Sequence, residues 1–132
     1  MTPAQLHLFA KHWLASWTGN QPIVLLSFYT ENAYYQDPAN TKGLEGKAEL
    51  AIYFNKLLQR NPNWVWEVVE LFPNKTGFTL KWKATIPVNE ARLQLFGMDI
   101  VELMDDKISR NEVYFDRHDW FQLLSKPVLP QL

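Results

Sequence analysis

The stretch FTLKWKATI, residues 78–86, decides the fold class, because apolar and polar residues alternate along its whole length. A period of two is typical of a β-strand with one buried face. Turn residues flank it at 73–77 and 87–90. Gly97 lies inside a later apolar stretch, where it predicts a bulge or bend. Three further strands are predicted in this half of the chain, at residues 64–72, 92–103 and 108–115. Together with residues 78–86 they form a predicted meander of about four strands.

The first half of the chain has helical periodicity instead. Thr2 and Gln5 form a predicted capping box at its start. The predicted elements here are a helix between Thr2 and Gly19, a helix from about Gln21 to Tyr29, a short strand at 33–36, a turn at 37–40 and a helix from Gly46 to Arg60. A last short helix is predicted from His118 to Leu124. Helices segregated from an antiparallel sheet indicate an α+β domain, which we expect to span residues 1–132.

Composition excludes several function classes. The chain has 132 residues, of which 47% are hydrophobic and 20% charged, as in soluble globular proteins with a real core. A net charge of -1 favours neither nucleic acid nor an anionic membrane as partner. Without cysteine there is no disulfide and no thiolate chemistry, and the three histidines form no zinc pattern, so we expect no metal. No apolar run is long enough to cross a bilayer, and the N-terminus lacks the pattern of a signal peptide, so we expect a cytoplasmic protein.

Two predicted strands are apolar on both faces. Residues 64–72 and 92–103 lack the polar alternation that a sheet with one face in water would carry. Their second face is therefore expected to be covered, by a partner chain or by the terminal segment. We predict a homodimer through the sheet.

Four strings, taken in their order and spacing, resemble the SnoaL-like and ketosteroid isomerase-like families of the nuclear transport factor 2-like superfamily. They are YYQDP at 34–38, GLEGKA at 43–48, GMDIVEL at 97–103 and VYFD at 113–116. The resemblance covers nearly the whole chain and implies a cone-shaped, curved antiparallel sheet wrapped around three N-terminal helices. It also implies a deep cavity for a small apolar ligand and catalysis by one or two carboxylates without cofactor. The reaction stays open, because this fold serves isomerases, cyclases, dehydratases, epoxide hydrolases and simple binding proteins.

The resemblance assigns roles to three residues. Asp37 aligns with the general base of ketosteroid isomerases, and Asp99 with their neutral, hydrogen-bond-donating carboxylic acid. Trp13 falls where that family has a tyrosine that polarises the substrate oxygen. Each has a plainer interpretation: Asp before Pro suits a turn, Asp99 can be paired structurally, and Trp13 can be core. The tryptophan argues against true ketosteroid isomerase activity.

One departure from the family concerns the last strand. Val113 stands where SnoaL-type cyclases and limonene epoxide hydrolase-like enzymes place a catalytic carboxylate. Asn111, at a position where cyclases often have histidine, can orient a ligand but cannot exchange a proton near neutral pH. These two residues weaken the cyclase and epoxide hydrolase mechanisms.

Aromatic side chains, 14% of the residues, are the predicted walls of the pocket. Tyr34 and Tyr35 flank its expected mouth, and we predict ligand contacts for Trp17, Trp66 and Trp82, although plain core packing would suit the same pattern. The sequence thus predicts a metal-free isomerase, cyclase or dehydratase acting on a small apolar carbonyl compound, with Asp37 as base. The alternatives are a non-catalytic ligand-binding module and an assembly domain with a filled core.

Overall fold

The computed structural model describes residues 1–125, which form one curved six-stranded sheet and four helices. The remainder of the predicted domain, residues 126–132, lies outside the described residues. The elements are α1 (Pro3–Ala15), α2 (Pro22–Leu26), β1 (Tyr29–Asp37), β2 (Asn40–Glu45), α3 (Lys47–Arg60), β3 (Val65–Pro73), β4 (Gly77–Val88), β5 (Ala91–Met104), β6 (Lys107–Tyr114) and α4 (His118–Ser125). The predicted α+β class is confirmed.

The sheet has the strand order β2-β1-β6-β5-β4-β3. Its last four strands are the predicted antiparallel meander. The β4–β5 register is continuous, whereas the β3–β4 and β5–β6 registers each contain one shift. The first hairpin, β1–β2, joins the other side of β6, and β1 runs parallel to β6. One pair of an otherwise antiparallel sheet is therefore parallel, because the chain crosses from the first hairpin through α3 to the far edge before it returns.

Two expectations for the first hairpin were wrong. Tyr29, predicted to end the second helix, begins β1, and α2 already ends at Leu26. The Ser27 hydroxyl donates to the Val24 carbonyl, and the Ile108 N–H donates to the Phe28 carbonyl, which draws this segment into the sheet. Residues 40–45, for which no strand is predicted, form the edge strand β2. Most of β2 is exposed or only half-buried, so its sequence carries no apolar alternation.

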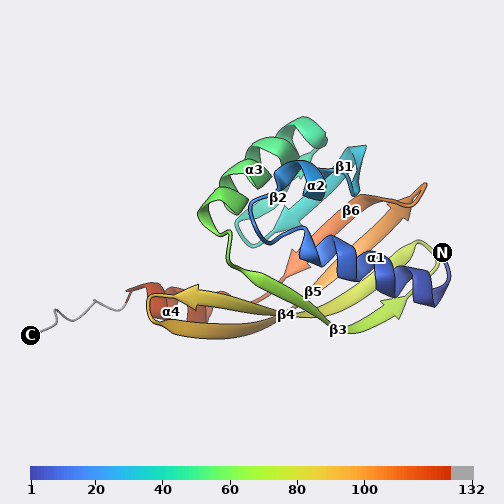
Figure 1. The fold of residues 1–132 in the computed structure, drawn as a ribbon. Coiled ribbons are helices and arrows are strands. Elements are labelled where there is room, and N and C mark those ends of the chain that lie inside the picture. Colours follow the sequence, from blue (N-terminus) through green and yellow to red (C-terminus); the bar gives the residue numbers. More distant parts are fainter. Residues whose placement is uncertain (126–132) are drawn as a thin grey trace, which may run out of the picture.

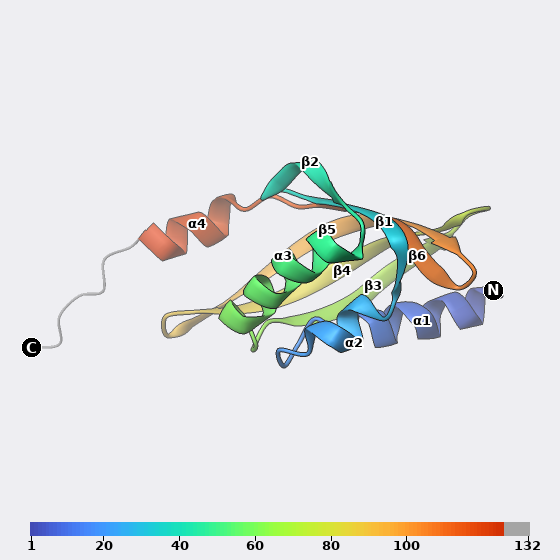
Figure 2. The ribbon, with the colours of Figure 1, turned by 90° about the horizontal axis from the view of Figure 1, so that it is seen from above.

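Helices α1, α2 and α3 gather on one side of the curved sheet, whereas α4 lies at the opposite end of the molecule from the N-terminus (Figures 1 and 2). The predicted capping box of α1 is present, with reciprocal hydrogen bonds between Thr2 and Gln5. Helix α3 buries one stripe at a spacing of four residues, which follows from its 3.6-residue period. The buried stripes of α1 and α3 are Leu6, Ala10, Trp13 and Leu14, and Leu50, Phe54 and Leu58.

Gly97 was predicted to mark a bulge or bend, and the structure has no bulge there. The β4–β5 register continues without a shift from Gly77 opposite Glu102 to Val88 opposite Ala91. Gly97 lies opposite Trp82, and a Cβ atom at Gly97 would stand 2.2 Å from Cζ2 of that indole. Glycine is therefore required because the Trp82 ring lies directly across the β5 backbone. This close approach lets the indole N–H reach Asp99, two residues further along β5.

We expect Gly97→Ala to destabilise the protein by roughly 1–3 kcal/mol, because the added methyl group forces the buried Trp82 ring aside. Urea unfolding followed by circular dichroism measures the change. Gln94→Ala, at an exposed position of the same strand, is the control and should unfold like the unaltered protein. An equally stable Gly97→Ala variant would show that Trp82 does not depend on this gap.

Candidate functional site

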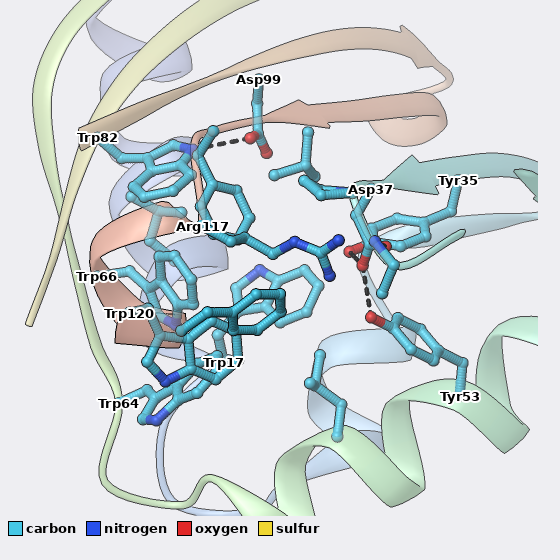
Figure 3. Close-up of a pocket in the computed structure, with 17 residues that line it drawn as sticks. Trp17, Tyr35, Asp37, Tyr53, Trp64, Trp66, Trp82, Asp99, Arg117 and Trp120 are labelled. Carbon is cyan, nitrogen blue, oxygen red and sulfur yellow. Dashed lines mark hydrogen bonds between the residues drawn. The ribbon is translucent and has the colours of Figure 1, made fainter. Parts of the chain in front are cut away.

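A pocket of about 150 Å³ lies between the helices and the sheet and is bordered at one end by α4 (Figure 3). Nine aromatic side chains contribute to its wall: Trp17, Tyr35, Tyr53, Trp64, Trp66, Trp82, Phe115, Trp120 and Phe121. Its charged groups are Asp37, Asp99 and Arg117. A cavity of roughly 150 Å³ accommodates a benzene-sized molecule, so the pocket suits a ligand with one ring.

The tryptophans of the wall hold one another edge to face. Trp66 packs on Trp82 with ring centroids 4.8 Å apart, and Trp64 packs on Trp120 at 5.1 Å. Aromatic pairs favour this geometry, and each adds stability beyond the buried area alone. Trp120 connects α4 to the rest of the wall. Because α4 has no buried residue, this contact helps to hold the helix against the pocket. The result is a preformed apolar surface.

Asp99 lies in this wall with 3% of its surface exposed. Its Oδ1 accepts a hydrogen bond from Trp82 Nε1 at 2.8 Å, and its Oδ2 accepts one from Asn111 Nδ2 at 3.0 Å. A carboxylate has about four lone-pair sites, so two stay available to a ligand. Burial raises the pKa of Asp99 to about 7, because it penalises the charged form more than the two donors stabilise it.

Behind Asp99 runs a buried chain of hydrogen bonds. Trp13 Nε1 donates to the Tyr29 hydroxyl at 3.3 Å, and that hydroxyl donates to Asn111 Oδ1 at 3.0 Å. Burial strongly raises the pKa of Tyr29, so its hydroxyl stays protonated. Trp13 and Asn111, for which the sequence predicts ligand contacts, are fully buried and do not line the pocket. Asn111 holds the Asp99 carboxylate, which does line the pocket, and Trp13 supports Asn111 through Tyr29.

Asp37 also lines the pocket but is engaged differently. Its Oδ1 accepts hydrogen bonds from the N–H groups of Ala39 and Asn40 and from Asn40 Nδ2, at 2.9–3.0 Å. Its Oδ2 accepts the hydroxyls of Tyr35 at 2.8 Å and Tyr53 at 2.5 Å. Five donors thus occupy about four lone-pair sites. Asp37 therefore both stabilises the turn that follows it and lines the pocket.

The two tyrosines beside Asp37 stay protonated. Burial raises the pKa of Tyr35 and of Tyr53 well above the ordinary value, and the negative charge of Asp37 raises both further. Their hydroxyls therefore act as hydrogen-bond donors throughout the physiological pH range. In this part of the pocket, the Asp37 carboxylate is therefore held in place by five hydrogen-bond donors.

The predicted wall residues Trp17, Trp66 and Trp82 line the pocket, and Tyr35 does so too. Tyr34 does not, because its ring lies against Gly43 and its hydroxyl donates to Gln36. Sequence reasoning missed Tyr29, which it assigned to a helix end. It also missed Tyr53, Trp64, Trp120 and Arg117. Tyr53 directly precedes the buried Phe54 of α3, and this position next to the buried stripe could have indicated it as a pocket residue. Arg117 directly follows the VYFD string but belongs to no helical or strand pattern, so the sequence gives no signal for it.

Residues 1–125 contain no group of three or more histidine, cysteine or acidic side chains arranged to hold a metal ion. Within the same range, no helix has the length and apolar character needed to cross a membrane.

Residues 10–111 match the family model of the SnoaL-like domain, and the chain belongs to this family, within the nuclear transport factor 2-like superfamily. No curated protein matches the sequence. A solved structure described as a proposed SnoaL-like polyketide cyclase from Jannaschia sp. CCS1 is similar, with a TM-score of 0.78, 13% identity and coverage of 97% of this chain and 98% of that chain. An LEH-like epoxide hydrolase from M. tuberculosis has a TM-score of 0.73 and 13% identity, over 92% of this chain and 90% of that chain.

A third similar structure carries a bound compound. It is a hypothetical protein with a ketosteroid isomerase-like fold from Catenulispora acidiphila DSM 44928, in complex with trimethylamine. Its TM-score is 0.71 at 16% identity, over 86% of each chain. At such identities the three structures establish the shared fold alone.

The raised pKa of Asp99 predicts a pH-dependent stability. In the unfolded chain Asp99 ionises near its ordinary pKa, whereas the folded protein keeps it protonated up to about pH 7. The stability this proton provides is complete below the unfolded pKa and is lost as the pH rises through the folded one. Between about pH 5 and about pH 8 we expect a loss of roughly 2–3 kcal/mol from this group.

Urea unfolding at these two pH values measures this loss, and Asp99→Asn should remove it. Asp105→Asn, which removes an exposed carboxylate in the β5–β6 turn, is the control and should keep the pH dependence of the unaltered protein. An identical slope in all three proteins would mean that Asp99 ionises normally in the folded state.

Proposed function

We propose that the chain binds a small, single-ring carbonyl compound in the aromatic pocket and transfers a proton on it through Asp99. The observation that carries this proposal is a buried carboxyl with a pKa of about 7, which lines the pocket and has lone pairs left for a ligand. A group with a pKa near the working pH is best suited to both accept and return a proton. The SnoaL-like fold, whose neighbours include proteins described as cyclase and epoxide hydrolase, supports a small-molecule role.

In the proposed reaction, the Asp99 carboxylate takes a proton from the carbon next to the carbonyl group. The C–H electron pair moves into a C=C bond, and the carbonyl oxygen takes up the charge as an enolate. Neutral Asp99 then returns the proton to the same or to a conjugated carbon, which gives exchange or isomerisation. The Tyr29–Asn111 chain behind Asp99 holds the carboxyl in one orientation during both steps.

Asp37, the base predicted from the family resemblance, is the competing assignment. It lines the same pocket, but its five hydrogen bonds leave no free lone pair to receive a proton in this conformation. Proton transfer to Asp37 would require at least one of these donors to leave. We therefore favour Asp99 as the proton acceptor and Asp37 as the group that positions Tyr35 and Tyr53.

A second candidate function is ligand binding without catalysis. It is favoured by Val113, which lines the pocket at the position where related cyclases and epoxide hydrolases have a catalytic carboxylate. In this case Asp99 would only anchor an oxygen of the ligand. The assembly-domain alternative is less well supported, because it expects a filled core where the chain has a pocket.

Deuterium exchange distinguishes these candidates. We expect the protein to accelerate exchange of the benzylic protons of phenylacetone in D₂O, followed by proton NMR, and Asp99→Asn to lower the rate by about 10²–10⁴-fold. Asp37→Asn should lower it less, and Asp106→Asn, in the exposed β5–β6 turn, should leave it unchanged. A larger loss in Asp37→Asn would reverse the assignment of the base. No acceleration despite measurable binding would support the binding module instead.

We also propose that the outer sheet face forms the predicted homodimer. Phe96, Met98 and Ile100 alternate along β5 with buried residues and so project from the face opposite Asp99. Phe96 is 55% exposed and forms a contiguous apolar row with the half-buried Met98 and Ile100, and such a row supports an interface on this face. A two-fold dimer would bring this patch against its own copy.

A charge on this face should prevent assembly. We expect a dimer for the unaltered protein and a monomer for Phe96→Glu in sedimentation velocity, because two glutamates would meet near the two-fold axis. Ile52→Glu, at an exposed apolar position on α3, is the control and should stay dimeric. A monomeric unaltered protein, or a dimeric Phe96→Glu variant, would reject this interface.

The cytoplasmic location and the lack of a nucleic-acid partner stay proposals that rest on composition. They follow from the absence of cysteine and from the near-zero net charge.

A further inference from the structure

Arg117 places a guanidinium group in the aromatic pocket. The residue precedes α4, and its side chain extends into the pocket toward Asp37 (Figure 3). The ring of Phe121, one turn later, lies 4.9 Å from Cζ of Arg117 and so supports it. The positive charge is near enough to the Tyr53 hydroxyl to oppose the rise of its pKa. Arg117 is half-buried, so part of its hydration is lost.

Within residues 1–125, Arg117 has no side-chain hydrogen bond or ion pair. The ion pairs of this part of the chain join Lys83 to Glu67 and Arg110 to Glu102 and Glu112. The absence of a pair with Asp37 has a physical cause, since both oxygens of that carboxylate are already occupied by five donors. Within the described residues, the N–H donors of the guanidinium therefore have no protein acceptor and stay open to solvent or to a ligand.

We infer that Arg117 binds a carboxylate on the ligand, so that the pocket takes a single-ring aromatic or planar acid. A guanidinium presents its donors as a planar fork that matches a carboxylate in two parallel hydrogen bonds. The aromatic walls suit the ring, and the pocket volume of about 150 Å³ matches a single ring. This inference rests on the proposed function only in assuming that the pocket is the ligand site.

The main alternative ligand is a small organic cation. Aromatic cages bind quaternary ammonium groups, and two carboxylates line this pocket. However, Asp37 already accepts five hydrogen bonds, and Asp99 is largely protonated below about pH 7, so neither carboxylate is well placed to pair with a ligand cation. The charge of Arg117 would in addition repel a cation. The acid is favoured for this reason.

Binding of three probes of nearly the same size tests the inference: benzoate, benzamide and phenyltrimethylammonium. Tryptophan fluorescence and ligand-observed NMR measure the affinities at about pH 6.5 for the full chain. We expect benzoate to bind at least tenfold more tightly than benzamide and phenyltrimethylammonium. Arg117→Met should remove this preference by lowering the affinity for benzoate far more than that for benzamide, and Arg117→Lys should retain part of it.

Arg60→Met, at the exposed end of α3, is the matched control and should bind benzoate like the unaltered protein. Equal affinities for benzoate and benzamide, or a preference for the ammonium compound, would overturn the role of Arg117 while leaving the pocket as the ligand site. Failure of every probe to bind would instead reject the pocket itself, and with it the proposed function. The affinity for benzamide shows that an Arg117 variant is folded, so loss of benzoate binding alone is decisive.

Discussion

The hydrogen bond from Trp82 Nε1 to Asp99 Oδ1, 2.8 Å long and fully buried, is the interaction on which the site depends. It exists because Gly97 has no side chain and allows the indole to cross the β5 backbone. The same indole forms part of the pocket wall through its contact with Trp66. One close approach between two neighbouring strands therefore fixes both the shape of the cavity and the position of its acid.

Asp37 and Asp99 are both buried, but they accept different numbers of hydrogen bonds. Asp37 accepts five hydrogen bonds and holds a turn and two tyrosines in place. Asp99 accepts two, from Trp82 and Asn111, which is too few to offset its burial. Burial, offset by only two donors, makes Asp99 a carboxyl suited to exchange a proton.

Much of the fold could be predicted from the sequence. Strand β4 and the helices α1 and α3 show their periods clearly, and the apolar stretches of β3 and β5 end at turn residues. The edge strand β2 could not, since its residues are too exposed to alternate. For the site, the family resemblance indicated Asp37 and Asp99, and the abundance of tryptophan indicated the wall. The partners of these residues could not be found this way: Tyr29 and Asn111 are separated by 82 positions, and only the parallel β1–β6 pairing brings them together.

The central claim is that Asp99 lies at the boundary between its neutral and charged forms near neutral pH. A titration of the side-chain carboxyl carbons by ¹³C NMR, with Asp99→Asn to assign the resonance, measures this directly. The account predicts a midpoint for Asp99 near 7. A midpoint near the ordinary aspartate value of about 3.9 would contradict it.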